Sequence, residues 1–180
     1  MIGGPDDPTQ KRKEIVKNAR SNNGSTNWAY EDRNGRYGPG TNKCNVFVDD
    51  MLDASGIYTP DPNGMSSSLR LGSPVTAGQW ADPNYNIPGW KVVGSPQAGD
   101  VVAIRANFSD ASGHVAIMVS PTQSIGAGHN EVHVTDFGSS SRHFSDFPGN
   151  NGYVYRRYIG FPSVVKPVQI NTNNYYRQYP

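Results

Sequence analysis

The spacing of hydrophobic residues changes along the chain, from a helical period near residue 50 to strict alternation after residue 100. The clearest helical pattern begins at Cys44 and ends near Gly56, a natural C-terminal stop. One face of this segment is apolar and the opposite face is acidic. The apolar positions are Phe47, Val48, Met51 and Leu52. The pattern predicts an amphipathic helix that opens with Cys44.

The segments on either side of this helix are less regular. Residues 1–9 have the composition of a mobile leader, and Thr9 is a candidate cap for a short helix over residues 10–20. Residues 57–97 are rich in Pro, Gly, Ser and Asn, and we expect a long ordered excursion with little regular structure. A loop of that length in a compact domain is usually functional.

Short β-branched or aromatic segments bounded by turn residues dominate the last third of the chain. The predicted strands are Asp100–Arg105, His114–Ser120, Glu131–Asp136 and Tyr153–Ile159. Residues 161–180 are a polar tail without a core of their own. With 180 residues in all, we expect one α+β domain over residues 1–160, with N-terminal helices and the Cys44 helix packed on an antiparallel sheet.

Composition excludes several functional classes. The formal net charge is +1, so there is no basic footprint for nucleic acid or for anionic lipid. No apolar run approaches the length of a membrane span, and the first residues lack the apolar segment of a secretory signal. A single cysteine excludes an internal disulfide and a cysteine-rich zinc site.

Cys44 is a candidate nucleophile, although a lone cysteine is often only a buried apolar residue. A thiol attacks as its thiolate, and unpaired N–H groups at a helix N-terminus favour that negative charge. The polar residues just before Cys44 indicate that it faces a cleft. We therefore expect the start of the helix to lower the pKa of the Cys44 thiol.

His114 is the candidate base for this nucleophile. It opens an otherwise apolar strand directly after Ser112 and Gly113, where an imidazole has no local use. A catalytic base needs an acceptor to orient it. Alternation in the strand that follows places Val132, Val134 and Asp136 on one face, so Asp136 is the best candidate for the orienting residue. A turn residue ahead of Phe137 and Gly138 explains it nearly as well.

The segment His129–His133 superficially resembles a His-Glu-x-x-His zinc-protease motif, but the glutamate is one place too late. That motif also needs a helix, whereas residues four apart in a strand lie about 13 Å from each other. We expect neither a metal nor another cofactor.

Two blocks of the sequence resemble the NlpC-type and CHAP cell-wall amidases, which are papain-like cysteine peptidases. Residues 42–52 resemble the block that begins the cysteine helix of that superfamily. Residues 96–104, Pro-Gln-Ala-Gly-Asp-Val-Val-Ala-Ile, and residues 113–119, Gly-His-Val-Ala-Ile-Met-Val, resemble its Pro-x-x-Gly-Asp and Gly-His-Val-Ala strands. The resemblance implies a papain-like fold.

By position, the resemblance assigns Cys44 as nucleophile, His114 as base, and Tyr30 as the tyrosine that lies beside the nucleophile and shapes the substrate site. The third catalytic member departs from the pattern. Where NlpC-type enzymes place a polar residue, this chain has residues 124–126, Ser-Ile-Gly, while the acidic residue of CHAP domains falls near Asp136. This departure favours a CHAP-like or bacterial-toxin branch.

The resemblance implies hydrolysis of an amide bond in the peptidoglycan stem peptide or a cross-link. Trp80, Tyr85 and Trp90 could wall the cleft for such an extended polar substrate, or simply pin the loop. The sequence shows neither a signal peptide nor a wall-binding repeat. By resemblance, this suggests an antibacterial effector that is delivered for example by type VI secretion and is active in the target-cell periplasm, or a toxin domain cut from a larger protein. Such an effector would have a cognate immunity protein.

Two other readings remain open at the level of sequence. A papain-like thioester can pass to an amine, which would give a transpeptidase, transglutaminase or deamidase acting on protein. Alternatively, Cys44 is buried and inert, and the aromatic residues of a non-enzymatic module bind glycan or protein.

Overall fold

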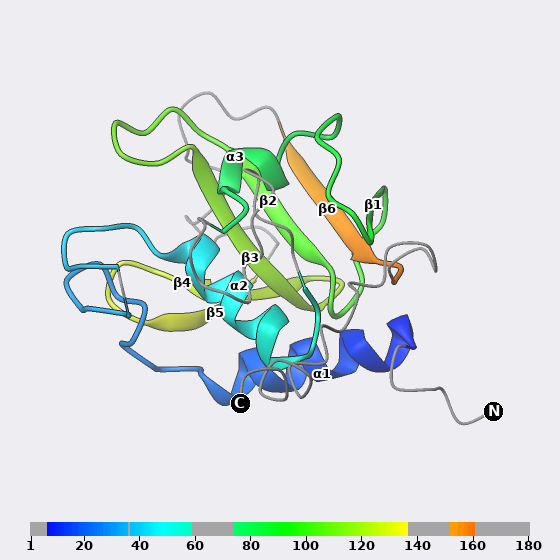
Figure 1. Ribbon diagram of the computed structural model, residues 1–180, viewed down its shortest axis with the longest axis horizontal. Coiled ribbons are helices and arrows are strands. Elements are labelled where there is room, and N and C mark those ends of the chain that lie inside the picture. The colour runs from blue at the N-terminus through cyan, green and yellow to red at the C-terminus, as the bar shows by residue number, and fades with distance from the viewer. Residues whose placement is uncertain (1–6, 36, 59–73, 137–151, 161–180) are drawn as a thin grey trace, which may run out of the picture.

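A computed structural model describes residues 7–35, 37–58, 74–136 and 152–160 of the chain (Figure 1). In chain order, the elements are α1 (Pro8–Ser21), α2 (Cys44–Ala54), α3 (Ala77–Trp80), β1 (Trp90–Val93), β2 (Val101–Arg105), β3 (Gly113–Ser120), β4 (Gln123–Ala127), β5 (Val132–Asp136) and β6 (Tyr153–Tyr158). Within these ranges no helix has the length and apolar character that a membrane crossing requires.

The six strands form one antiparallel sheet in the order β1-β6-β2-β3-β4-β5. The four strands predicted from alternation are present as β2, β3, β5 and β6. β1 and β4 were not predicted, because β1 lies inside the Pro- and Gly-rich excursion and β4 contains the small residues Ser124 and Gly126. A Cβ at Gly126 would lie 2.9 Å from the Cβ of Ala116, so the close approach of β3 and β4 explains a glycine in this strand.

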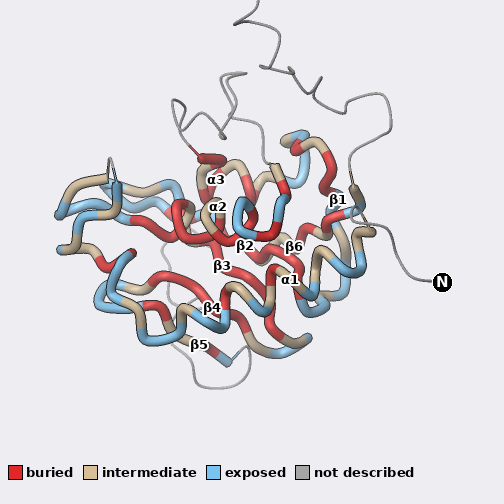
Figure 2. The backbone as a smooth tube through the Cα atoms, turned by 60° about the horizontal axis from the view of Figure 1, so that its bottom comes forward, coloured by how far each residue is buried: buried red, intermediate tan, exposed pale blue. Residues whose placement is uncertain are grey.

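The helices cover one face of the sheet. Buried residues of α1 and α2 share a core cluster with alternate strand positions such as Val115, Ile117 and Ile125. The intervening strand positions, among them Val102, Ile104 and Met118, form a second cluster with Tyr153 and Tyr155 on the other face. Because both faces of β2 and β3 are apolar, these strands are buried throughout most of their length (Figure 2). The α+β prediction, with the Cys44 helix on an antiparallel sheet, is confirmed.

The helix boundaries follow from local chemistry. α2 begins at Cys44 as predicted and ends at Ala54, and Gly56 follows with a φ of +65°. α1 starts earlier than expected, because Asp7 rather than Thr9 is the cap: its carboxylate accepts a hydrogen bond from the Thr9 N–H at 3.0 Å. Residues 8 and 9 are therefore helical and not part of a leader.

The excursion over residues 57–97 contains more regular structure than expected. The short helix α3 starts with a capping box, in which Thr76 and Gln79 exchange hydrogen bonds. The strand β1 lies near the end of the excursion. Residues 1–6, most of the predicted leader, and residues 161–180, the predicted tail, lie outside the described part of the chain.

Candidate active site

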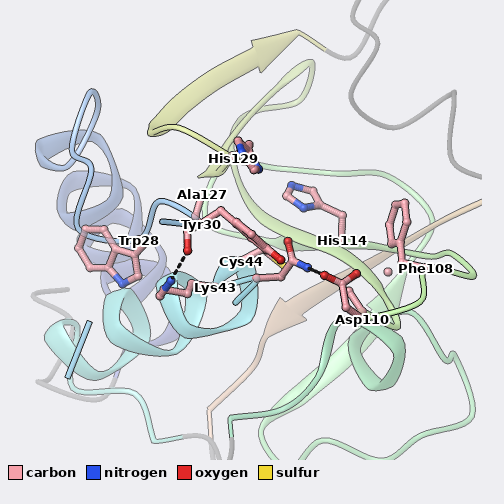
Figure 3. Close-up of a pocket in the computed structure, with 13 residues that line it drawn as sticks. Trp28, Tyr30, Lys43, Cys44, Phe108, Asp110, His114, Ala127 and His129 are labelled. Atoms are coloured by element: carbon pink, nitrogen blue, oxygen red, sulfur yellow. Dashed lines mark hydrogen bonds between the residues drawn. The ribbon is translucent and has the colours of Figure 1, made fainter. Parts of the chain in front are cut away.

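A pocket of about 280 Å³ lies where the start of α2 meets the first residues of β3 and the end of β4. Figure 3 shows its lining. The residues are Trp28, Tyr30, Asn42, Lys43, Cys44, Phe108, Asp110, Ala111, Gly113, His114, Ala127, Gly128 and His129. Three of the residues singled out in the sequence, Tyr30, Cys44 and His114, are thus brought together from segments far apart in the chain.

Cys44 is the first residue of α2 and lines the pocket, yet its side chain is only 7 % exposed. Burial raises the pKa of the Cys44 thiol. Hydrogen bonds from the backbone N–H groups of Val115, Asn45 and Cys44 itself act in the opposite direction and are outweighed. The start of the helix therefore acts as predicted, but the expectation of a lowered thiol pKa is wrong, because the sequence does not reveal the desolvation.

His114 is held beside the cysteine by the start of β3. It pairs with Ile104 of β2, and the residue after it, Val115, contacts the Cys44 sulfur through its N–H group. The glycine before it is required by geometry: Gly113 has a φ of +145°, and a Cβ there would lie 2.0 Å from the Ile104 carbonyl oxygen. Gly113 thus allows β3 to start close against β2, and His114 follows at the end of the strand that lies near Cys44.

Tyr30 is fixed at the pocket through its backbone and its ring. Its N–H donates to the His129 carbonyl at 2.8 Å, and its own carbonyl accepts from the Gly40 N–H at 2.8 Å. The phenol ring stacks on the His129 imidazole, with centroids 5.0 Å apart and planes at 21°. In Figure 3 the ring extends toward Cys44.

Further pocket residues were not identified from the sequence. Trp28 donates from Nε1 to the Asp50 carboxylate at 2.8 Å and packs edge-on against Phe47. Asn42 donates to Asp110 at 2.9 Å, which links the segment before Cys44 to the loop between β2 and β3. Phe108 in the same loop is 37 % exposed, and His129 follows β4. For Trp28, the sequence gives one indication of a place in the site: residues 21–43 are polar, with too few apolar residues to form a core, yet they contain large aromatic residues.

Asp136 lies away from this pocket, which corrects its assignment as the residue that orients His114. It pairs with Gln123 at the far end of β4, and its carboxylate accepts from the Gln123 side chain at 2.7 Å. Continuing the register of Ile117 with Ile125 places Gly128 across from His114. From Gln123 to Gly128 a strand extends roughly 16 Å, far beyond hydrogen-bond reach.

Trp80, Tyr85 and Trp90 do not wall the cleft, which corrects the second expectation about the site. Trp80 and Trp90 are buried in the core and pack edge-to-face with centroids 5.0 Å apart, while Tyr85 packs against the same cluster. The alternative that these aromatic residues pin the excursion agrees with this placement.

The Pro-x-x-Gly-Asp block has a structural part in the fold. Asp100 is completely buried, accepts from the Gln97 N–H at 2.7 Å, and forms an ion pair with Arg157 at 2.7 Å. The hydrogen bonds that the Arg157 guanidinium donates to the Asp100 carboxylate raise the pKa of Arg157. The block thus joins β2 to β6 and is not part of the pocket.

Among the described residues, no group of three or more His, Cys, Asp or Glu side chains could hold a metal ion. His133 lies on β5, so the second histidine of the zinc-like motif is on a strand, as the alternation predicts. Its Nδ1 lies 3.2 Å from the Glu131 carbonyl oxygen.

Comparison with protein families decides the relationship. The CHAP domain profile matches residues 33–135, more than half of the chain. The chain belongs to the CHAP domain family. The match includes Cys44 and His114, and ends before Asp136. Membership supports a peptidoglycan hydrolase-type function, and it confirms the predicted superfamily and papain-like fold.

Two solved structures resemble the fold of this CHAP domain. One is Rv1477, described as a hypothetical invasion protein of Mycobacterium tuberculosis, with a TM-score of 0.48 and 16 % identity over 86 % of this chain and 64 % of that one. The other is a mutated form of the resuscitation promoting factor interacting protein RipA, with a TM-score of 0.47 and 15 % identity over 86 % and 65 %. The chain thus spans slightly less than two thirds of either protein. No curated protein matches it.

Proposed function

We propose that this CHAP domain is a cysteine amidase or endopeptidase that cleaves an amide bond in the peptidoglycan stem peptide or in a cross-link. The observation that carries the proposal is the meeting of Cys44, at the start of α2, with His114, at the start of β3, in one pocket. Family membership supports peptidoglycan as the substrate class, and the pocket brings together a candidate nucleophile and a candidate base.

The buried sulfur determines how the reaction begins. Because burial raises the pKa of the Cys44 thiol, the resting side chain is neutral near pH 7. His114 accepts the thiol proton as the sulfur attacks the carbonyl carbon of the scissile amide. A carbon–sulfur bond forms, and the carbonyl π electrons move to the oxygen. The backbone N–H groups at the start of α2 and the Tyr30 hydroxyl are the candidate donors to this oxyanion.

The second half of the reaction returns the proton. The carbon–nitrogen bond breaks, its electron pair leaves with the amine, and the His114 imidazolium protonates that nitrogen. Water, deprotonated by His114, then attacks the thioester and releases the carboxylic acid and the Cys44 thiol. Besides Cys44 and His114, the titratable side chains that line the pocket are those of Tyr30, Lys43, Asp110 and His129.

The test is digestion of purified peptidoglycan by the wild type, Cys44→Ala and His114→Ala, with fragments resolved by mass spectrometry. We expect new fragments whose masses identify one hydrolysed amide bond, and no such fragments from Cys44→Ala. Thermal unfolding of each variant checks that the fold is kept. Wild-type protein that leaves the muropeptides unchanged would contradict the proposal.

A non-enzymatic binding module is the second candidate, favoured by the burial of the Cys44 thiol and its raised pKa. In that case Cys44→Ala would bind peptidoglycan as the wild type does, and neither would cut it.

The delivery of the protein stays a prediction of the sequence. We propose an antibacterial effector active in the periplasm of a target cell, opposed by a cognate immunity protein that plugs the pocket. Directing the domain to the periplasm of a test bacterium should cause lysis that requires Cys44. Growth unaffected by that expression would contradict the effector role without bearing on hydrolysis in vitro.

A further inference from the structure

The residue before the nucleophile is a buried lysine. Lys43 is only 2 % exposed, and its ammonium group donates to three backbone carbonyls: Ala29 at 2.9 Å, Tyr30 at 3.2 Å and Thr41 at 3.0 Å. These bonds match the three N–H donors of an ammonium group. Desolvation lowers the pKa of Lys43, while the nearby carboxylates of Asp32 and Glu31 oppose the shift.

The three carbonyls belong to two segments that meet at the pocket. Ala29 and Tyr30 lie in the segment that carries the Tyr30 phenol, and Thr41 lies in the turn that leads into α2. Lys43 is also the N-cap residue of α2, and its side chain makes no capping bond to the helix. The Lys43 ammonium group instead links these two segments through its hydrogen bonds to their carbonyls. Figure 3 shows the ammonium below the Tyr30 backbone, with the phenol extending the other way toward Cys44.

We propose that Lys43 is a positioning residue for Tyr30. Its ammonium holds the Tyr30 segment against the start of α2, so that the phenol keeps its place over Cys44 and against His129. The inference rests on the proposed hydrolase function for its kinetic consequences, and on the geometry alone for its effect on access to the thiol.

A second buried cation in the same chain provides a matched control. Arg156 on β6 is also 2 % exposed and also donates to three carbonyls of one loop, those of Trp80, Asp82 and Tyr85. It does not line the pocket. If a buried cation only stabilises the loop it binds, removing either charge should have the same kind of effect.

The kinetic experiment compares Lys43→Met, Arg156→Met, Tyr30→Phe and the double variant of Lys43 and Tyr30 on a defined muropeptide, well below each melting temperature. We expect Lys43→Met to lower kcat by about tenfold to a hundredfold, because a displacement near 1 Å has effects of that size. The double variant should lose little more than Lys43→Met alone, since coupled residues are not additive. Arg156→Met should lower the melting temperature and keep kcat.

Equal kcat in Lys43→Met and Arg156→Met, or fully additive losses in the double variant, would overturn the inference. Lys43→Gln, which keeps amide donors without the charge, replaces Lys43→Met if the latter does not fold.

A second readout does not depend on turnover. The rate of Cys44 alkylation by iodoacetamide, at the high-pH plateau where the thiolate is fully formed, measures access to the sulfur. Lys43→Met should raise this plateau, and Arg156→Met should leave it at the wild-type value. An unchanged plateau in Lys43→Met would overturn the inference even if peptidoglycan is not the substrate, whereas an inactive wild type with a raised plateau would contradict only the proposed function.

Discussion

The pocket and the loop around Trp80 are built from similar parts but perform different tasks. Each combines aromatic side chains with a buried cation that binds three backbone carbonyls, Lys43 in one region and Arg156 in the other. Around Arg156 the rings turn inward and close the core. Around Lys43 the ring of Tyr30 borders a pocket that contains a thiol. Aromatic richness in a sequence therefore does not separate a binding wall from a core; the direction of the rings does.

The largest effect that would sharpen this contrast is on stability. Trp80→Ala should lower the free energy of unfolding by about 3–5 kcal/mol, because it removes a fully buried indole. Chemical denaturation measures this loss. The muropeptide KM of the folded protein should stay unchanged. A weakened KM with unaltered stability would show that Trp80 belongs to the substrate site after all.

A smaller effect concerns pH. Because the pKa of the Cys44 thiol is raised in the folded protein, the neutral thiol contributes stability that is fully present below the thiol pKa of the unfolded chain, about 8.5. That contribution is lost as the pH rises through the higher folded value. The wild type should thus lose more stability than Cys44→Ala between pH 7 and pH 10 in thermal melts.

The same shift predicts slow alkylation of Cys44 by iodoacetamide at pH 6. Rapid reaction at that pH would indicate a preformed ion pair between thiolate and imidazolium, and the proposed first proton transfer would be wrong.

The smallest effect is expected at Asp136. Asp136→Asn should leave kcat nearly unchanged, because Asp136 pairs with Gln123 at the end of β4 that lies away from His114. The free energy of unfolding should change by no more than about 0.5 kcal/mol, because the Asp136 side chain is exposed. Muropeptide hydrolysis measured beside the wild type checks it. A large loss of kcat would mean that Asp136 orients the base despite its position.

Much of the fold could be predicted, because burial imposes a period on the sequence. The helix from Cys44 and the strand from His114 carry strong patterns, and both were identified together with their places in the site. β4 could not be identified in this way, since Gly126 fits the close contact with Ala116 and adds no hydrophobic signal.

The direction of the pKa shift of the Cys44 thiol also could not be predicted from the sequence. The position of Cys44 at a helix start is visible in the sequence, whereas the packing that removes water from its sulfur depends on β3. The local pattern predicts the N–H groups at the start of α2, but neither the Val115 N–H of β3 nor the desolvation of the sulfur. The same limit applies to His129, which stacks on Tyr30 through contacts between distant segments.

The tight start of β3 has a consequence for how such a pocket can evolve. A single methyl group at residue 113 would collide with the Ile104 carbonyl, and the backbone would have to shift to relieve it. That shift would carry the imidazole of His114 and the amide of Val115 together, because they are consecutive on the same strand. The proton acceptor and one of the sulfur's hydrogen-bond donors therefore move as one body. A mutation that moves the His114 imidazole would therefore also move the Val115 amide, and the reverse holds as well.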